Sequence, residues 1–198
     1  AEKKREAETE IVANELEKLN FNLKELPTKK NILAEGGEFY FCPKDKLLFS
    51  GINRNTIAGA ECVASFLNAN ELILIDTPSF HLDTVFTTIF DKQGALSAMI
   101  VCKELITKDS FKNLEKISKK LNVHIIIIPK KDSVGTDDYL GTLAVNSFCA
   151  PGLLISSSNY SDFSVKEKLD SLGVKTEVCP VSQFQLSGGS VHCLTNEL

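Results

Sequence analysis

Near the end of the sequence, Cys193 combines a reactive side chain with a setting that suits covalent chemistry. It lies a few residues after the glycine pair Gly188-Gly189, so a flexible turn precedes it. A thiol on a strand after such a turn can act as a nucleophile when its surroundings favour the thiolate. A free cysteine also behaves as a small hydrophobic residue. The tail alone therefore leaves two interpretations open, a nucleophile and a buried thiol.

A histidine and an aspartate stand two positions apart in His81-Leu82-Asp83. Alternate residues of a strand share one face, so we expect His81 and Asp83 to point the same way, with Leu82 opposite. That arrangement brings a base and a carboxylate to one site. The same pattern also fits a polar cross-strand pair on a solvated face.

Two acidic residues flank a second glycine pair in Glu35-Gly36-Gly37-Glu38. Paired glycines let the backbone turn tightly or approach a ligand, and a carboxylate beside such a turn can point into a cavity. A solvated turn with two exposed acids is the alternative. Glu35 precedes His81 by 46 residues, which is close to the period of an internal repeat.

The repeat is a helical pattern that ends in leucine and a short polar turn and then runs into a strand-like segment. It occurs four times, at Leu19, Leu67, Leu121 and Leu172, with spacings of 48, 54 and 51 residues. Pairs of strand-like runs lie between the helical patterns, so the expected unit is strand, strand, helix, strand. The alternative is an ordinary α/β domain with coincidental spacing. The expected strand pairs are Phe39–Cys42 with Leu47–Ser50, Thr84–Phe90 with Leu96–Cys102, and Leu143–Cys149 with Leu153–Ser156.

The units are too small to bury their own apolar faces, which favours an arrangement around a shared axis, as in a propeller. Asp109 and Asp162 are the expected N-caps of two of the helices. The N-terminal unit is incomplete and shows only its helix and last strand, while residues Gln185–Leu198 are expected to form a strand. Equivalent positions of different units then converge on the axis. Such convergence would bring the thiol of Cys193 to an imidazole and two carboxylates, a nucleophile with a cation-binding clamp.

The other histidines and cysteines have simpler interpretations. His192 is expected to face away from Cys193, because neighbours on a strand point to opposite faces. His124 lies in an apolar strand and reads as a packed or edge histidine. No C-x-x-C pair is present among the six cysteines, so no metal site is predicted. The cysteines expected in the core are Cys42, Cys62, Cys102, Cys149 and Cys179.

Composition narrows the class of protein. The 198 residues fit one domain, residues 1–198, with 43% hydrophobic and 24% charged residues. A net charge of −4 argues against a nucleic-acid partner, and no apolar run is long enough for a membrane span. Nothing in the sequence marks secretion, so reduced thiols in the cytoplasm are expected. The sequence opens at Ala1 inside a charged helical pattern, and we expect further residues upstream.

The three motifs, in this order, resemble the guanidino-group modifying enzymes of the pentein fold. The group includes arginine deiminase, dimethylarginine dimethylaminohydrolase, agmatine deiminase and the amidinotransferases. Glu35-Gly36-Gly37 resembles the E-G-G-D motif, with Glu38 in place of its aspartate. The segment from His81 to Phe86 is very similar to H-L-D-T-V-F, and Gly188 to Thr195 resembles the G-G-x-x-H-C-x-T segment around the catalytic cysteine.

The resemblance implies a pentein-type α/β propeller of pseudosymmetric units with a central active site. It implies that Cys193 is the nucleophile and His81 the general acid/base. Glu35 joins this catalytic set, and Glu35 and Asp83 hold the substrate guanidinium. Arg54 falls near a family arginine that can meet a substrate carboxylate, and Asn146 is a similar substrate-binding match. Relatives also carry a substrate-binding acid in an N-terminal module that this sequence does not show.

The expected function is hydrolysis of a guanidinium C–N bond of arginine or a methylated arginine, giving citrulline and ammonia or an alkylamine. No cofactor is expected, and the expected partner is a small guanidino compound, with no nucleic acid and no membrane. A homo-oligomer or association with a separate N-terminal segment fits the incomplete first unit. An amidinotransferase and a non-catalytic binding module of the same fold are the alternatives. A cysteine hydrolase of peptides does not explain the two additional carboxylates.

Overall fold

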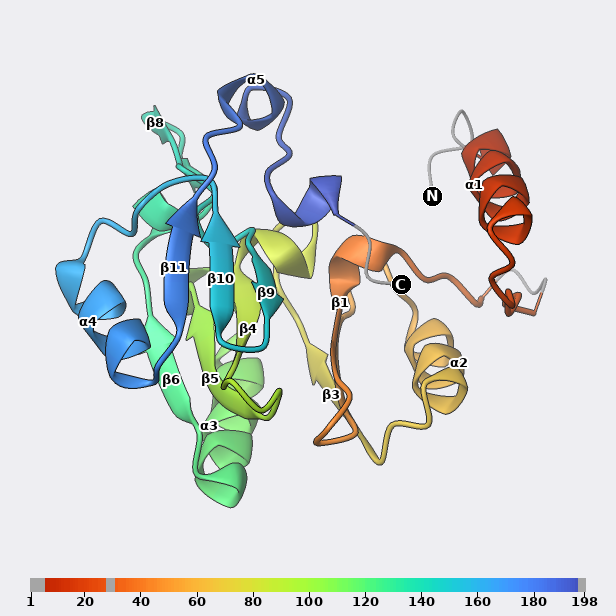
Figure 1. Cartoon of the computed structure of the whole chain (residues 1–198), viewed down its shortest axis with the longest axis horizontal. Helices are drawn as coiled ribbons and strands as arrows, with labels where there is room; N and C mark the ends of the chain where they lie inside the picture. The colour runs from red at the N-terminus through yellow and green to blue at the C-terminus, as the bar shows by residue number, and fades with distance from the viewer. Residues whose placement is uncertain (1–5, 28–30, 196–198) are drawn as a thin grey trace.

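Three copies of one unit, a strand pair followed by a helix and a third strand, build most of the computed structural model (Figure 1). The structure describes residues 6–27 and 31–195. In each unit the second strand is central, antiparallel to the first and parallel to the third. The predicted repeat is therefore confirmed. Its elements are β1 (Phe39–Cys42), β2 (Leu47–Gly51), α2 (Ile57–Phe66) and β3 (Glu71–Ile75); β4 (Phe86–Phe90), β5 (Leu96–Val101), α3 (Lys108–Leu121) and β6 (His124–Ile127); and β9 (Phe148–Ala150), β10 (Leu153–Ser156), α4 (Phe163–Ser171) and β11 (Lys175–Val178).

Each helix of the repeat begins after a polar side chain that accepts a hydrogen bond from the first turn. The caps are Thr56 for α2, Thr107 for α3 and Asp162 for α4. These side chains satisfy backbone N–H groups that have no partner within the helix. The predicted cap Asp162 is confirmed. The predicted cap Asp109 is wrong, because α3 begins earlier, at Lys108, and Asp109 lies inside its first turn.

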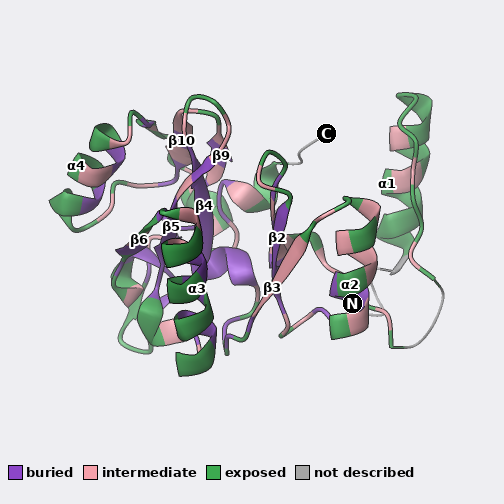
Figure 2. Cartoon of the chain, turned by 90° about the horizontal axis from the view of Figure 1, so that it is seen from below, coloured by how far each residue is buried: buried purple, intermediate pink, exposed green. Residues whose placement is uncertain are grey.

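The apolar core lies between the sheets of the three units. Strands β2 and β4 are buried along their whole length, and Phe49 of β2 packs against Phe86 of β4 with ring centroids 5.0 Å apart. Burying each of these rings contributes about 1.5–3 kcal/mol relative to leaving it exposed. Figure 2 shows the buried strands in the middle, with α2, α3 and α4 presenting exposed faces outward. The units thus share one core, as predicted.

The first strands of the three units lie side by side, because β4 contacts both β1 and β9. The segments that lead into these strands therefore meet in one region. They are residues 35–38 before β1, residues 81–84 before β4, and Asn146 before β9. The sequence prediction that equivalent positions of different units converge is confirmed for these three segments.

Four predicted strands are absent or altered. The strand expected over Leu143–Cys149 is present only at its end, because β9 begins at Phe148. Residues 21–27 form no strand and belong to none of the described sheets. Residues 82–84 form a 3-10 helix, η3 (Leu82–Thr84), before β4. The C-terminal segment forms the short helix α5 (Ser182–Gln185) and the 3-10 helix η6 (His192–Leu194). Gly188 has a φ of 82° between them, and a strand does not pass through such a residue.

Two further elements complete the described chain. Helix α1 (Glu6–Lys18), which was predicted, lies at the outer edge beyond α2 with mostly exposed side chains (Figure 1). A small hairpin of β7 (Gly135–Thr136) and β8 (Tyr139–Leu140) precedes β9. Within residues 6–27 and 31–195, no helix has the length and apolar character needed to cross a bilayer.

Candidate active site

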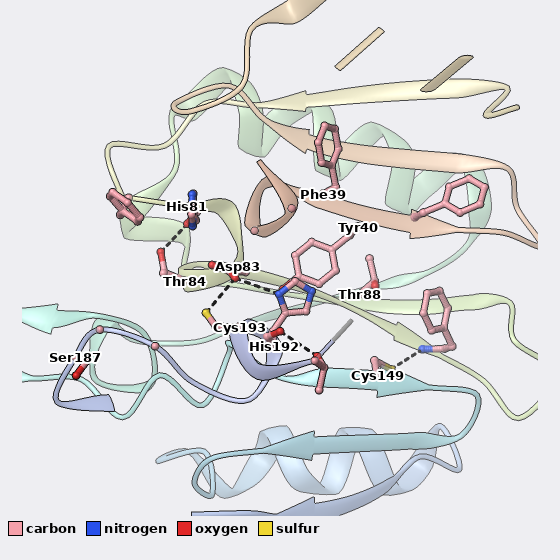
Figure 3. Close-up of a pocket in the computed structure, with 18 of the residues that line it drawn as sticks. Phe39, Tyr40, His81, Asp83, Thr84, Thr88, Cys149, Ser187, His192 and Cys193 are labelled. Carbon is pink, nitrogen blue, oxygen red and sulfur yellow. Dashed lines mark hydrogen bonds and ion pairs between the residues drawn. The ribbon is translucent and has the colours of Figure 1, made fainter. Parts of the chain in front are cut away.

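A cavity of about 720 Å³ opens where the segments before β1 and β4 meet the C-terminal turn (Figure 3). His81 and Asp83 line it from the segment before β4, and His192 and Cys193 line it from η6. In Figure 3, Asp83 lies between His81 and Cys193. The aromatic residues of its wall are Phe39, Tyr40, Phe41, Phe80 and Phe90.

Asp83 is the buried acid of this cavity, with only 1% of its surface exposed. Its Oδ2 lies 3.1 Å from Nδ1 of His192 and 3.5 Å from Sγ of Cys193. Its other oxygen, Oδ1, is buried and has no hydrogen-bond partner among the described residues. A buried carboxylate is costly unless its oxygens are paired. The site is therefore suited to a ligand that brings N–H donors and positive charge.

Cys193, the middle residue of η6, is held by Asn146, a fully buried residue. The amide Nδ2 of Asn146 lies 3.2 Å from Sγ of Cys193, and Oδ1 accepts the Cys193 N–H at 3.4 Å. Although the cysteine as a whole is exposed, these contacts direct its sulfur toward Asp83. Partial burial and the negative charge of Asp83 both raise the pKa of the Cys193 thiol. These surroundings therefore favour the neutral thiol, and an added positive charge would favour the thiolate.

His81 is anchored by Glu35. Nε2 of His81 lies 2.8 Å from Oε2 of Glu35, and the other oxygen of Glu35 lies 3.3 Å from Arg54 Nη2. Burial alone raises the pKa of a carboxyl group, but hydrogen bonds from His81 and Arg54 outweigh it and hold the pKa of Glu35 well below its ordinary value. Glu35 thus contacts both the His81 imidazole and the Arg54 guanidinium, and it is not among the residues that line the cavity.

Glu38, the second acid of its motif, is completely buried and has a bracing role. Its carboxylate accepts the backbone N–H of Arg54 at 2.7 Å and that of Leu82 at 2.8 Å. Burial raises its pKa, and these two hydrogen bonds oppose the rise. A Cβ on Gly51 would lie 1.7 Å from Oε2 of Glu38, so the carboxylate occupies space that only glycine leaves open. Glu38 thereby ties the segments after β2 and before β4 together.

His192 is the site residue that the sequence interpretation missed. It was expected on a strand, facing away from Cys193; in the 3-10 turn its Nδ1 instead contacts Asp83, and its ring stacks on Tyr40 with centroids 4.8 Å apart. A carboxylate only accepts hydrogen bonds, so Nδ1 of His192 carries the hydrogen. Neighbouring side chains of a 3-10 helix diverge by about 120° rather than 180°. The glycine turn at residues 188–189 was the available signal against a strand.

The predicted site residues fall into two layers. Cys193, His81 and Asp83 line the cavity. Glu35, Arg54 and Asn146 do not line it, and each of them contacts a member of the site.

His124 is exposed on β6, in agreement with an edge histidine. The core prediction is confirmed for the buried Cys42, Cys102 and Cys149, whereas Cys62 is only partly buried and Cys179 is exposed. In the described part of the chain, no group of three His, Cys, Asp or Glu side chains is placed to hold a metal ion.

The glycine pair beside the site gives a matched test of its packing. A Cβ on Gly37 would lie 2.7 Å from Nδ1 of His81 and 3.1 Å from Oδ2 of Asp83, whereas a Cβ on Gly36 meets nothing within 4 Å. The His81 ring cannot simply yield, because Glu35 and Phe80 hold it. We expect Gly37→Ala to lower kcat/KM by about tenfold to a hundredfold, since displaced catalytic groups lose that order of rate.

Steady-state kinetics on Gly37→Ala and Gly36→Ala check this prediction, with the second variant as the control. Gly36→Ala should stay close to wild type. Equal losses in the two variants, or a fully active Gly37→Ala, would contradict the packing described for His81.

Comparison with known proteins gives no match for the sequence but clear matches for the structure. No protein-family model matches the sequence, and no curated protein matches it either. The structure, in contrast, superimposes on solved structures along nearly its whole length. The N-terminal domain of ArgZ, an arginine dihydrolase from the ornithine-ammonia cycle in cyanobacteria, bound to substrate, matches with a TM-score of 0.77 and 22% identity. That match covers 97% of this chain and 66% of the ArgZ domain, so the chain spans slightly less than two thirds of its length.

Two further structures support the same fold. AgrE in complex with L-arginine matches with a TM-score of 0.76 and 19% identity, over 97% of this chain and 27% of that chain. DDAH from Pseudomonas aeruginosa in complex with citrulline matches with a TM-score of 0.64 and 16% identity, over 96% of this chain and 67% of that chain. At these identities the likeness concerns the fold. The chain therefore has the pentein fold of the guanidino-group modifying enzymes, as its three motifs predicted.

Proposed function

We propose that the chain hydrolyses a guanidinium C–N bond through a covalent intermediate on Cys193. The observation that carries the proposal is the Asp83 carboxylate. It is buried, lies 3.5 Å from the Cys193 sulfur and keeps one oxygen without a described partner. A guanidinium offers planar pairs of N–H donors that match a carboxylate. Binding to Asp83 would therefore set its central carbon beside the thiol.

Substrate binding also activates the nucleophile in this proposal. The negative charge of Asp83 contributes to the raised pKa of Cys193. A bound guanidinium neutralises that charge and adds a cation next to the sulfur, and both effects favour the thiolate. The thiol is thus kept largely protonated until a cationic substrate arrives. Because the thiolate forms only after the substrate binds, the exposed cysteine is protected from reactions with other electrophiles.

The chemical steps follow from the placement of His81. The thiolate attacks the guanidinium carbon and forms a C–S bond, while His81 gives a proton to the departing nitrogen as the C–N bond breaks. Ammonia or an alkylamine leaves, and an amidino thioether remains on Cys193. Water then attacks the same carbon, His81 takes a proton from that water, and the C–S bond breaks to release a ureido product. Glu35 keeps the His81 ring in place during both transfers.

Arginine or a methylated arginine is the substrate that we propose, which makes citrulline the product. Support comes from the three motifs and from the fold, which is shared with proteins whose structures contain L-arginine and citrulline. All six cysteines are free thiols, which fits a reducing compartment such as the cytoplasm.

A direct assay tests the proposed function. The protein is incubated separately with arginine, N-methylated arginines and agmatine, and ureido product is measured by a colorimetric or chromatographic assay. Product from at least one guanidine, with Cys193 protected from iodoacetamide by the same compound, supports the proposal. Absence of ureido product from every one of these guanidines would instead favour a non-catalytic binding module of the same fold.

A further inference from the structure

Two side chains of the C-terminal turn η6 meet the same carboxylate oxygen of Asp83. Nδ1 of His192 lies 3.1 Å from Oδ2, and Sγ of Cys193 lies 3.5 Å from that oxygen. A thiol is a weak hydrogen-bond donor, so the N–H of the imidazole is the stronger of the two partners. The steps proposed for hydrolysis give Cys193 and Asp83 a task and leave His192 without one.

The carboxylate of Asp83 needs a partner that fixes its rotation. The torsion that turns an aspartate carboxyl group is broad and roughly two-fold, so the backbone alone does not decide where each oxygen points. The other oxygen, Oδ1, has no hydrogen-bond partner among the described residues. The hydrogen bond from His192 is therefore the strongest one described for this carboxylate.

His192 is itself held in place by its neighbours. Its ring stacks on Tyr40 with centroids 4.8 Å apart and an angle of 27° between the planes (Figure 3). Tyr40 is buried and packs edge-on against Phe86 at 5.5 Å. The backbone N–H of His192 donates to the carbonyl oxygen of Asn146 at 3.3 Å. These contacts present Nδ1 to Asp83 from a fixed position.

We propose that His192 is a positioning residue that orients the Asp83 carboxylate for the substrate guanidinium and occupies the oxygen that the Cys193 thiol would otherwise hold alone. The inference rests on the guanidinium-binding role given to Asp83 in the proposed function. Two other roles for His192 make different predictions. One is simple packing of the ring against Tyr40, and the other is direct proton transfer during the reaction.

Two substitutions separate the hydrogen bond from the ring. His192→Phe keeps an aromatic ring beside Tyr40 and removes the donor, whereas His192→Asn keeps an N–H donor near the place of Nδ1 and removes the ring. We expect His192→Phe to raise KM for a guanidine, because the ground state also binds Asp83, and to lower kcat/KM by about tenfold to a hundredfold. His192→Asn should recover most of this loss. The same two exchanges at the exposed His124 are the control and should leave both constants close to wild type.

Alkylation of Cys193 tests the same link without turnover. Burial and the negative charge of Asp83 raise the pKa of this thiol. Without the His192 donor, Oδ2 of Asp83 is left to the thiol hydrogen. Iodoacetamide should therefore modify Cys193 in His192→Phe about twofold to tenfold more slowly at pH 7, as followed by mass spectrometry of the Cys193 peptide. In an Asp83→Asn background the same exchange should have little effect, because residues of one hydrogen-bond network act non-additively.

The outcomes distinguish the three roles. Slower alkylation and a raised KM in His192→Phe, both largely restored in His192→Asn and both absent from the Asp83→Asn background, support the positioning role. A wild-type His192→Phe with an impaired His192→Asn would overturn it in favour of packing on Tyr40. Equal losses of kcat in the two variants, with KM and alkylation unchanged, would overturn it in favour of proton transfer by His192.

Two further points keep the test decisive. Circular dichroism checks that each variant is folded, and His192→Gln, whose amide reaches the place of Nε2 rather than Nδ1, replaces His192→Phe if the latter does not fold. If no guanidine is turned over by the wild type, the proposed function fails. The alkylation rates still decide whether His192 acts on Cys193 through Asp83, and an unchanged rate without the donor contradicts it.

Discussion

Cys193→Ser should lose turnover by about a thousandfold or more, because a serine hydroxyl does not ionise near neutral pH and removal of a nucleophile has effects of this size. The exchange of sulfur for oxygen changes little volume, and Cys193 is exposed in the turn η6. The fold and the thermal midpoint should therefore be retained. Steady-state assays of ureido product, together with circular dichroism, measure both properties.

Cys179→Ser is the matched control for this variant. Cys179 is also exposed, follows β11 and does not line the cavity, so its replacement should leave the rate close to wild type. Cys193→Ser with an unchanged rate would remove the proposed nucleophile. Loss of activity in both variants would indicate a general sensitivity to thiol replacement and would contradict a special role for Cys193.

Asp83→Asn should lower kcat/KM and, at the same time, raise the reactivity of the Cys193 thiol. The loss of the carboxylate charge should lower kcat/KM by about a hundredfold or more, since removing one partner of a buried charge pair costs about 2–5 kcal/mol. The same charge contributes to the raised pKa of Cys193, so its removal lowers that pKa. The thiol should then react faster with iodoacetamide near pH 7 in the absence of substrate. A purely structural role of Asp83 would not make the thiol more reactive.

The measurement is the pH dependence of alkylation, compared with kcat/KM for the same preparations. Asn can still accept the His192 hydrogen bond through its amide oxygen, so the local packing should survive. Asp76→Asn, at an exposed position after β3, is the charge-matched control and should change neither quantity. Slower alkylation of Asp83→Asn would refute the electrostatic coupling between Asp83 and Cys193.

Much of the architecture could be predicted because local sequence patterns reveal the repeat. Helical spacing, the leucine that ends each helix and the strand pairs all recur at nearly constant intervals. The meeting of Glu35 with His81 follows from that repeat, since both residues lie just before the first strand of their units. The prediction of a shared location was therefore correct, although the strand alternation used to orient His81 and Asp83 was wrong. A 3-10 turn places them instead.

The remaining features depend on contacts between distant segments. Over three residues, a 3-10 turn and a strand cannot be separated by periodicity, which is why the orientation of His192 was missed. Its contact with Asp83 joins residues 109 positions apart. Likewise, the sequence shows two acids around the first glycine pair without showing which one is buried. The structure makes Glu38 a buried brace and Glu35 the partner of His81.

Trapping of the covalent intermediate tests the central claim most directly. The protein is mixed with a guanidine substrate, quenched in acid and digested, and the peptide that carries Cys193 is analysed by mass spectrometry. We predict an amidino adduct on Cys193 that forms and decays with turnover and is missing from Cys193→Ser. Ureido product formed while the Cys193 peptide stays unmodified, or an adduct on another cysteine, would contradict the claim.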